Sequence, residues 1–223
     1  MSMYQARRTP IYRGPAAWSK ILANQPPAQV IDRDVSADFA IIGAGFAGIS
    51  AAMRLKELQP NASIVMLEAG RMAEGASGRN SGFMIDLPHE IQAEDYAGEG
   101  ESSDRDIIRL NRQAIAFAGR AVERYNIDRN FFDPVGKVNG AASDTADHLN
   151  RSYQAHLSKL GEASELLDAK AMYEMTGSHH YISGLYSPGT TMIQPAGYVR
   201  GVAEGLRRDG VLIFENSPVV KFE

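Results

Sequence analysis

Hydrophobic residues fall into short apolar runs and longer amphipathic stretches, and this pattern begins abruptly at residue 38. The run Asp38–Ile42 is nearly all apolar and stops at a glycine, which is typical of a strand buried on both faces. Residues 47–58 carry apolar side chains at helical spacing and precede a proline. A second apolar run over 63–67 closes on Glu68. Together these segments predict a right-handed βαβ unit.

Further along the chain, predicted helices and strands alternate. Residues 104–125 form the clearest amphipathic helix, and Asp104 and Asp106 near its start suit the positive end of the helix dipole. The elements expected next are a strand over 135–142, a helix over 145–160, a short helix opening at Asp168, a strand over 181–186, a helix over 195–208 and a buried strand over 211–214. The chain then reverses into a last strand over 219–222.

Residues 1–37 show no lasting helical or strand period and carry four of the ten prolines. Two interpretations of this segment stay open. Tyr12 and Trp18 favour an arm that lies against the body of the protein, and the alternative is a mobile leader.

Composition excludes several classes of protein. The chain has 223 residues, of which 44% are hydrophobic and 22% charged, and this balance is globular. A net charge of −4 without a basic run gives no reason to expect a nucleic-acid partner. The absence of cysteine excludes disulfides, thiolate metal sites, cysteine nucleophiles and cysteinyl cofactor attachment, and it suits a reducing compartment. No apolar stretch reaches the roughly 18 residues of a membrane span, and no secretory signal is recognisable. We therefore expect a cytoplasmic protein.

The loop between the first strand and helix, Gly43–Gly48, reads G-A-G-F-A-G and fits the pattern G-x-G-x-x-G, with Glu68 twenty positions after its last glycine. In such a loop Gly43 permits the tight turn, Gly45 leaves room for a pyrophosphate, and Gly48 lets the helix pack closely. The free N–H groups at the helix start bind phosphates. Glu68 suits ribose hydroxyls and repels a 2′-phosphate, which disfavours an NADP-type ligand. The motif predicts a dinucleotide site and leaves open which dinucleotide binds.

A second glycine-rich stretch, Gly75–Gly82, follows at once and reads G-A-S-G-R-N-S-G, where a nicotinamide dehydrogenase would continue with further β-α repeats. With this stretch the sequence resembles the FAD-dependent oxidoreductases of the D-amino-acid oxidase and glycine oxidase superfamily, nearest the branch that includes γ-glutamylputrescine oxidoreductase. The likeness spans about residues 36–223. It rests on Gly75–Gly82 above all, then on Asp38–Gly48, Leu67–Ala69, Gln194–Ala196 and Asn216–Val219.

The resemblance implies FAD as the cofactor. It places Glu68 at the adenosine ribose with Arg71 close by, runs Ala76–Gly82 beside the pyrophosphate and the flavin ring, and brings Val219 to the adenine through its backbone. Glycines in Ala76–Gly82 would let the backbone approach the cofactor, and the polar side chains there would donate to it. Motif and resemblance together predict these cofactor-binding residues: Gly43, Gly45, Phe46, Ala47, Gly48, Glu68, Ala69, Arg71, Ala76, Ser77, Gly78, Arg79, Asn80, Ser81, Gly82 and Val219.

The expected fold class is α/β: a Rossmann-like FAD-binding domain with a βαβ start and a parallel sheet, into which part of an α+β substrate domain is inserted. The expected domains are an arm over 1–37, the first part of the FAD-binding domain over 38–103, part of the substrate domain over 104–192, and a return to the FAD-binding domain over 193–223. Members of this group usually continue well past this length. The resemblance therefore implies an N-terminal half whose partner is the C-terminal remainder of the same protein.

The activity that the resemblance implies is oxidation of the C–N bond of an amine or amino acid, with hydride transfer to flavin N5 and hydrolysis of the imine by water. It assigns no catalytic residue within this chain. Three alternatives stay open: oxidation of a 2-hydroxy acid or polyol on the same scaffold, a non-catalytic dinucleotide-binding fragment, and an NAD-dependent dehydrogenase.

The histidines and tyrosines give weaker signals. The five histidines form no metal-binding pattern with a spaced carboxylate, so no metal site is expected. His89 follows the glycine-rich stretch and is a candidate for approaching the flavin, against an ordinary surface position. Tyr181, Tyr186 and Tyr198 are candidates to line a substrate cavity, against ordinary partial burial.

Overall fold

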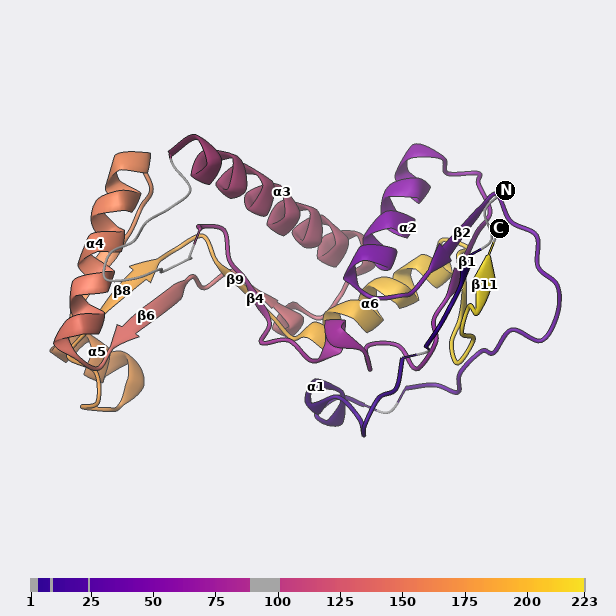
Figure 1. The fold of residues 1–223 in the computed structure, drawn as a ribbon, viewed down its shortest axis with the longest axis horizontal. Coiled ribbons are helices and arrows are strands. Elements are labelled where there is room, and N and C mark those ends of the chain that lie inside the picture. Colours follow the sequence, from indigo (N-terminus) through magenta and orange to yellow (C-terminus); the bar gives the residue numbers. More distant parts are fainter. Residues whose placement is uncertain (1–3, 9, 24, 89–100, 223) are drawn as a thin grey trace. The chain divides into compact units, whose positions relative to one another are not determined.

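The computed structural model describes residues 4–8, 10–23, 25–88 and 101–222 (Figure 1). The chain divides into two compact units, one of residues 1–82, 120–132 and 193–223, and a second of residues 83–119 and 133–192. Within the described ranges, no helix combines the length and the apolar character that a membrane crossing requires. The expected domain limits at residues 38, 104 and 193 stay predictions, and the compact units differ from them in assigning residues 83–103 to the second unit and 120–132 to the first.

The first unit contains the predicted βαβ arrangement. Strand β2 (Phe39–Ile42) is followed by helix α2 (Phe46–Leu58) and strand β3 (Ile64–Leu67). Strand β10 (Leu212–Phe214) joins them in a parallel sheet of order β10–β3–β2. The side chain of Met66 lies in the centre of this sheet and is fully buried. The expectation of a parallel α/β sheet is therefore confirmed for this unit.

One expectation about this sheet is wrong. Strand β2 was expected to be buried on both faces, but it lies at the edge of the described sheet, and Ala40 and Ile42 are exposed. Ile42 retains 56% of its accessible surface. An apolar run shows that a segment favours a strand, but it does not show whether that strand lies at the centre or at an edge.

Helix α6 (Pro195–Arg208) has the predicted bounds. Its start is defined locally, because Pro195 occupies the first turn and the Gln194 side chain accepts a hydrogen bond of 2.6 Å from Gly197 N. Its buried face contributes Val199, Val202, Ala203 and Leu206 to the core of the first unit.

The described residues between 4 and 31 lie against the rest of the first unit as an arm rather than as a mobile leader. Strand β1 (Tyr4–Gln5) pairs antiparallel with β11 (Lys221–Phe222), and the two lie side by side in Figure 1. The single-turn helix α1 (Ala17–Lys20) follows. Trp18 Nε1 donates to Asn80 O at 2.8 Å, and Ile31 N donates to Ser217 Oγ at 3.0 Å.

The second unit is built on an antiparallel sheet of order β6–β8–β7, with β6 at Lys137–Ala141, β7 at Glu165–Asp168 and β8 at Ser183–Ser187. Helix α4 (Asp144–Leu160) contacts β6 and β8, and helix α5 (Ala169–Thr176) contacts β7 and β8. Asp168 caps the N-terminus of α5 by accepting a hydrogen bond from Ala171 N, in agreement with the short helix predicted to open at this residue. The core cluster consists of Leu87, Ile108, Tyr153, Leu157, Leu160 and Leu185.

The remaining elements are short, apart from helix α3. They are the 3₁₀ turns η1 (Ala76–Gly78) and η2 (Arg129–Phe131), the strands β4 (Phe83–Met84), β5 (Phe132–Asp133) and β9 (Thr191–Ile193), and the helix α3 (Glu101–Tyr125). Strand β4 pairs antiparallel with β9, and β5 is the third strand of that sheet. Strands β4, β5, β7 and β9 were not predicted, because two to four residues are too few to establish a period.

Asp104 makes a contact that its predicted place near the start of a helix does not include. Helix α3 begins at Glu101, three residues before the predicted start, and Asp104 still lies near its N-terminus. The Asp104 carboxylate is buried and lies 2.7 Å from His156 Nε2 of α4. Asp104 therefore links two helices of the second unit rather than only facing the dipole of its own helix.

Candidate functional site: a dinucleotide cleft in the first unit

The glycine loop after β2 has the geometry that its sequence predicts. Gly43 has φ +91°, a left-handed conformation that side-chain-bearing residues rarely adopt, and its N–H donates to Leu67 O at 2.8 Å. A Cβ on Gly48 would lie 2.0 Å from Gly43 O, so only glycine lets α2 approach the strand end this closely. The loop therefore turns directly from β2 into the N-terminus of α2.

Glu68 connects this loop to the segment after β3. Its two carboxylate oxygens accept from Ala44 N at 2.9 Å and from Gly70 N at 3.0 Å. Each carboxylate oxygen can accept a second hydrogen bond, so Glu68 keeps acceptor capacity for ribose hydroxyls while it is held by the backbone. This fixed carboxylate at the end of β3 fits the predicted ribose partner.

The N-terminus of α2 faces Ser77. Phe46 N donates to Ser77 Oγ at 3.0 Å, and a Cβ on Gly45 would lie 2.7 Å from the same oxygen. The oxygen of the Ser77 hydroxyl therefore accepts a hydrogen bond at the start of a helix. This is a position where the free N–H groups and the helix dipole favour an anionic oxygen. The chemistry of this position fits a phosphate, and it joins Gly45, Phe46 and Ser77 in one place.

A cavity of about 220 Å³ lies at the carboxyl ends of β2 and β3. It brings together four predicted cofactor-binding residues, Gly43, Glu68, Ala69 and Val219, from three separate parts of the chain. Its full lining is Arg8, Pro10, Tyr12, Ile42, Gly43, Leu67, Glu68, Ala69, Pro218 and Val219. Sites for whole ligands usually measure about 300–1,000 Å³, so this volume suits the adenosine end of a dinucleotide.

The Gly75–Gly82 segment is held mainly by its own polar groups. Asn80 Nδ2 donates to Ser77 O at 2.9 Å, and its Oδ1 accepts from Gly82 N at 2.9 Å. Arg79 donates to Glu74 O at 2.8 Å and to Gly14 O at 2.6 Å. Contact of Arg79 and Asn80 with the cofactor stays a prediction.

Two glycines of this segment allow close contacts between backbone segments of the same chain. These contacts are a second reason for the glycines, besides the approach of a cofactor. A Cβ on Gly78 would lie 1.7 Å from Ala73 O, and one on Gly82 would lie 2.3 Å from Ile193 O. Gly82 also has φ +84°. The close packing of backbone on backbone therefore requires glycine at both positions.

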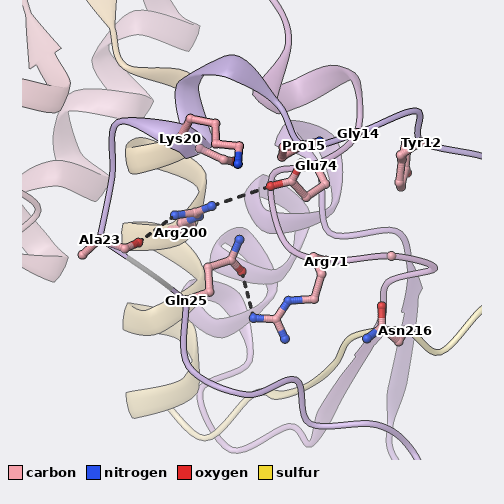
Figure 2. A pocket seen from close by; sticks show the side chains of 12 residues that line it. Tyr12, Gly14, Pro15, Lys20, Ala23, Gln25, Arg71, Glu74, Arg200 and Asn216 are labelled. Carbon is pink, nitrogen blue, oxygen red and sulfur yellow. Dashed lines mark hydrogen bonds and ion pairs between the residues drawn. The ribbon is translucent and has the colours of Figure 1, made fainter.

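Arg71 lines a different cavity from Glu68. Its guanidinium donates to Pro26 O at 2.5 Å and lies 3.6 Å from the buried carboxylate of Glu215. It borders a larger cavity of about 770 Å³, where Figure 2 shows Arg71 reaching toward Gln25, and Arg200 toward Glu74. Burial, more than any neighbouring charge, lowers the pKa of Arg200. The proximity of Arg71 to a bound ribose stays a prediction.

The weaker candidates have different outcomes. His89 lies outside the described residues. Tyr198 is buried beside Phe46, with ring centroids 6.2 Å apart, and burial raises its pKa to about 12. Tyr181 and Tyr186 belong to the second unit and border neither of the two cavities above. Among the residues with described positions, no cluster of histidine and carboxylate side chains could hold a metal ion.

The sequence analysis missed the arm residues Arg8, Pro10 and Tyr12 in the lining of the smaller cavity. Burial first, and the charge of Glu68 second, raise the pKa of Tyr12, which places its phenol near that carboxylate. The only sequence signal for these residues is an aromatic and a basic side chain in a proline-containing segment. Such a signal does not show which part of the protein the segment covers.

The sequence pattern that defines the family described as FAD dependent oxidoreductase matches residues 38–223. A probable oxidoreductase OrdL of Haemophilus influenzae is 29% identical over 195 residues, which cover 87% of this chain and 44% of the relative. The γ-glutamylputrescine oxidoreductase of Escherichia coli is 26% identical over 204 residues, covering 88% of this chain and 46% of the relative.

Among solved structures, glycine oxidase from Geobacillus kaustophilus superposes with a TM-score of 0.63 at 22% identity. The superposition covers 81% of this chain and 46% of the oxidase. At this sequence identity it shows a similar fold and no more. The chain spans somewhat less than half the length of these three proteins.

Proposed function

Because this chain belongs to the family of FAD dependent oxidoreductases, we propose that the cleft after β2 and β3 holds the adenosine and diphosphate of FAD, and that the whole protein oxidises the C–N bond of an amine or amino acid. The observation that carries the proposal is the cavity that unites Gly43, Glu68, Ala69 and Val219. These four residues come from the glycine loop, the end of β3 and the segment after β10.

The residues of the cleft have distinct roles in this proposal. Glu68 binds the ribose with the acceptor capacity that its two backbone hydrogen bonds leave free. The N-terminus of α2 and the hydroxyl of Ser77 bind the diphosphate: the N–H of Phe46, which donates to Ser77 Oγ in this structure, lies where a phosphate oxygen is favoured, and the hydroxyl hydrogen of Ser77 is a further donor there. The carboxylate of Glu68 also disfavours a ligand with a 2′-phosphate. Bound FAD supplies the acceptor for the hydride that leaves the substrate carbon.

The substrate class is inferred from the names of similar proteins. γ-Glutamylputrescine oxidoreductase and glycine oxidase are both named for nitrogen-containing compounds. We assign no catalytic residue within this chain, and we place substrate recognition in a C-terminal remainder of the same protein. A cytoplasmic location completes the proposal, and the cysteine-free sequence suits such a reducing compartment.

The test is anaerobic reduction of the flavin in the purified full-length protein. We expect a yellow protein whose visible flavin absorbance bleaches on addition of an amine or amino acid. Bleaching by 2-hydroxy acids or polyols alone would show C–O rather than C–N oxidation. A flavin that no such compound reduces would indicate a non-catalytic nucleotide-binding protein. Nicotinamide-dependent turnover without any flavin spectrum would overturn the assignment of FAD.

A further inference from the structure

We propose that Arg8 and Tyr12 of the N-terminal arm are cofactor-binding residues, and that Arg8, Pro10 and Tyr12 form an outer wall over the adenosine end of the dinucleotide. This inference rests on the proposed FAD site. It adds to that site a segment that lies outside the βαβ motif and outside residues 38–223, which match the family.

The spacing of the lining residues identifies this wall. The arm contributes Arg8, Pro10 and Tyr12 to the smaller cavity, and these are alternate positions along the chain. Alternate side chains of an extended segment point to the same side. Ile11 retains 84% of its accessible surface, as expected for the opposite side. Arg8, Pro10 and Tyr12 therefore border the cavity, whereas Ile11 does not and is more exposed than Tyr12.

The arm is anchored on both sides of this segment. Before it, Tyr4 stacks on Phe222 with ring centroids 5.0 Å apart, and Ala6 N donates to Val220 O at 2.9 Å. This anchor lies next to Val219, the predicted adenine contact.

After the segment, the arm is anchored to the second glycine-rich stretch and to the loop before it. Arg79 Nη2 donates to Gly14 O, and Ala16 N donates to Glu74 Oε2, both at 2.6 Å. Arg8, Pro10 and Tyr12 are therefore held between the two parts of the chain that the FAD assignment places at opposite ends of the adenosine diphosphate.

Tyr12 is seated where two glycines make room for its ring. A Cβ on Gly70 would lie 2.7 Å from the ring, and one on Gly75 would lie 3.0 Å from the phenol oxygen. The guanidinium of Arg79 lies 5.9 Å from the ring centroid. Tyr12 borders both the smaller and the larger cavity, so its side chain is a wall that they share.

Arg8 supplies the charge that a dinucleotide requires. It is the only cationic residue among the ten that line the smaller cavity, and Glu68 is the only anionic one. A diphosphate bound at the start of α2 carries negative charge near Glu68. A guanidinium facing the same cavity offsets this unfavourable pairing, so Arg8 favours a bound diphosphate over a neutral nucleoside.

Equilibrium binding of FAD and of ADP to the flavin-free full-length protein tests the inference. Arg8→Gln should weaken both ligands by about two- to fivefold, as for a partly exposed ion pair. Tyr12→Ala should weaken both by about tenfold, as for loss of an aromatic contact to a base or sugar. The effect of Arg8→Gln should shrink as the salt concentration rises.

Arg7→Gln and Ile11→Ala are matched controls, because they make similar changes at neighbouring positions that do not line the smaller cavity. We expect both to bind FAD and ADP as the wild-type protein does. Equal affinities for Arg8→Gln and Arg7→Gln, together with equal affinities for Tyr12→Ala and Ile11→Ala, would refute the role of the arm. Circular dichroism establishes whether each variant is folded. If Tyr12→Ala does not fold, the comparison of Arg8→Gln with Arg7→Gln tests the inference by itself.

The outcomes separate this inference from the proposed function. A wild-type protein that binds neither FAD nor ADP would refute the proposed site itself. A wild-type protein that binds both, with no effect of either arm variant, would refute only the contribution of Arg8 and Tyr12.

Discussion

At the scale of single residues, Gly45 is the position where an added side chain most directly tests the phosphate site. Its Cβ would lie 2.7 Å from Ser77 Oγ, beside the N-terminus of α2. Gly45→Asp adds a negative charge there, and we expect it to weaken FAD binding by about tenfold or more, because like charges repel in a partly buried cleft. Flavin content after purification and FAD titration measure this effect.

The matched control for that substitution is Ala51→Asp, which places the same charge on the exposed face of α2. It should retain wild-type flavin content, and both variants should keep their helical circular dichroism signal. A Gly45→Asp protein with stoichiometric flavin would contradict the assignment of the diphosphate to this helix.

Tyr198 gives a prediction about pH at the same scale. The residue is 5% exposed, and burial raises the pKa of its phenol to about 12 from an ordinary value of about 10. The unfolded chain therefore ionises first as the pH rises. The stability contributed by the neutral phenol is complete below about pH 10 and is lost progressively up to about pH 12.

Tyr198→Phe should remove this part of the pH dependence, which amounts to at most about 2–3 kcal/mol of the free energy of unfolding. Urea unfolding of both proteins at a series of alkaline pH values measures the difference. The wild-type protein should lose stability more steeply than Tyr198→Phe, and parallel curves would contradict the buried, neutral phenol.

At the scale of elements, the packing of α6 against the end of α3 depends on one glycine. A Cβ on Gly205 would lie 2.2 Å from the ring of Tyr125, whose hydroxyl donates to Asp209 at 3.0 Å. Alanine favours a helix over glycine by up to about 1 kcal/mol, but overpacking costs about 1–3 kcal/mol. We therefore expect Gly205→Ala to lower the free energy of unfolding, as measured by urea denaturation.

Removing the ring tests the cause of that loss. Tyr125→Leu in the Gly205→Ala background should destabilise the protein by less than the sum of the two single substitutions. Additive losses would show that Gly205 is required for a reason other than the Tyr125 ring.

The elements also show which parts of the fold a sequence pattern can predict. Helix α6 has its predicted bounds because Gln194, Pro195 and Gly210 define its ends locally. Strand β4 depends on pairing Phe83 with Met192, and no local pattern marks such a distant partner. The edge position of β2 was missed for the same reason, since an edge is defined by neighbouring strands and not by the strand itself.

At the scale of the whole molecule, the part of the candidate site that could be predicted from the sequence is the part that one backbone geometry requires. The turn at Gly43, the close approach at Gly48 and the acidic strand end at Glu68 all follow from one βαβ geometry. The arm could not be placed in this way, because its position depends on pairing with β11 and on contacts to the second glycine-rich stretch.

Tyr12 packs against Gly70 and Gly75, which lie about sixty residues further along the sequence. A methyl group at Gly70 would displace the ring, one at Gly75 would press on the phenol oxygen, and a smaller side chain at position 12 would remove the need for both glycines. Natural variation at these three positions should therefore be correlated. Proteins that keep an aromatic residue at position 12 should keep both glycines, whereas lineages that have lost the arm should accept larger residues at the other two.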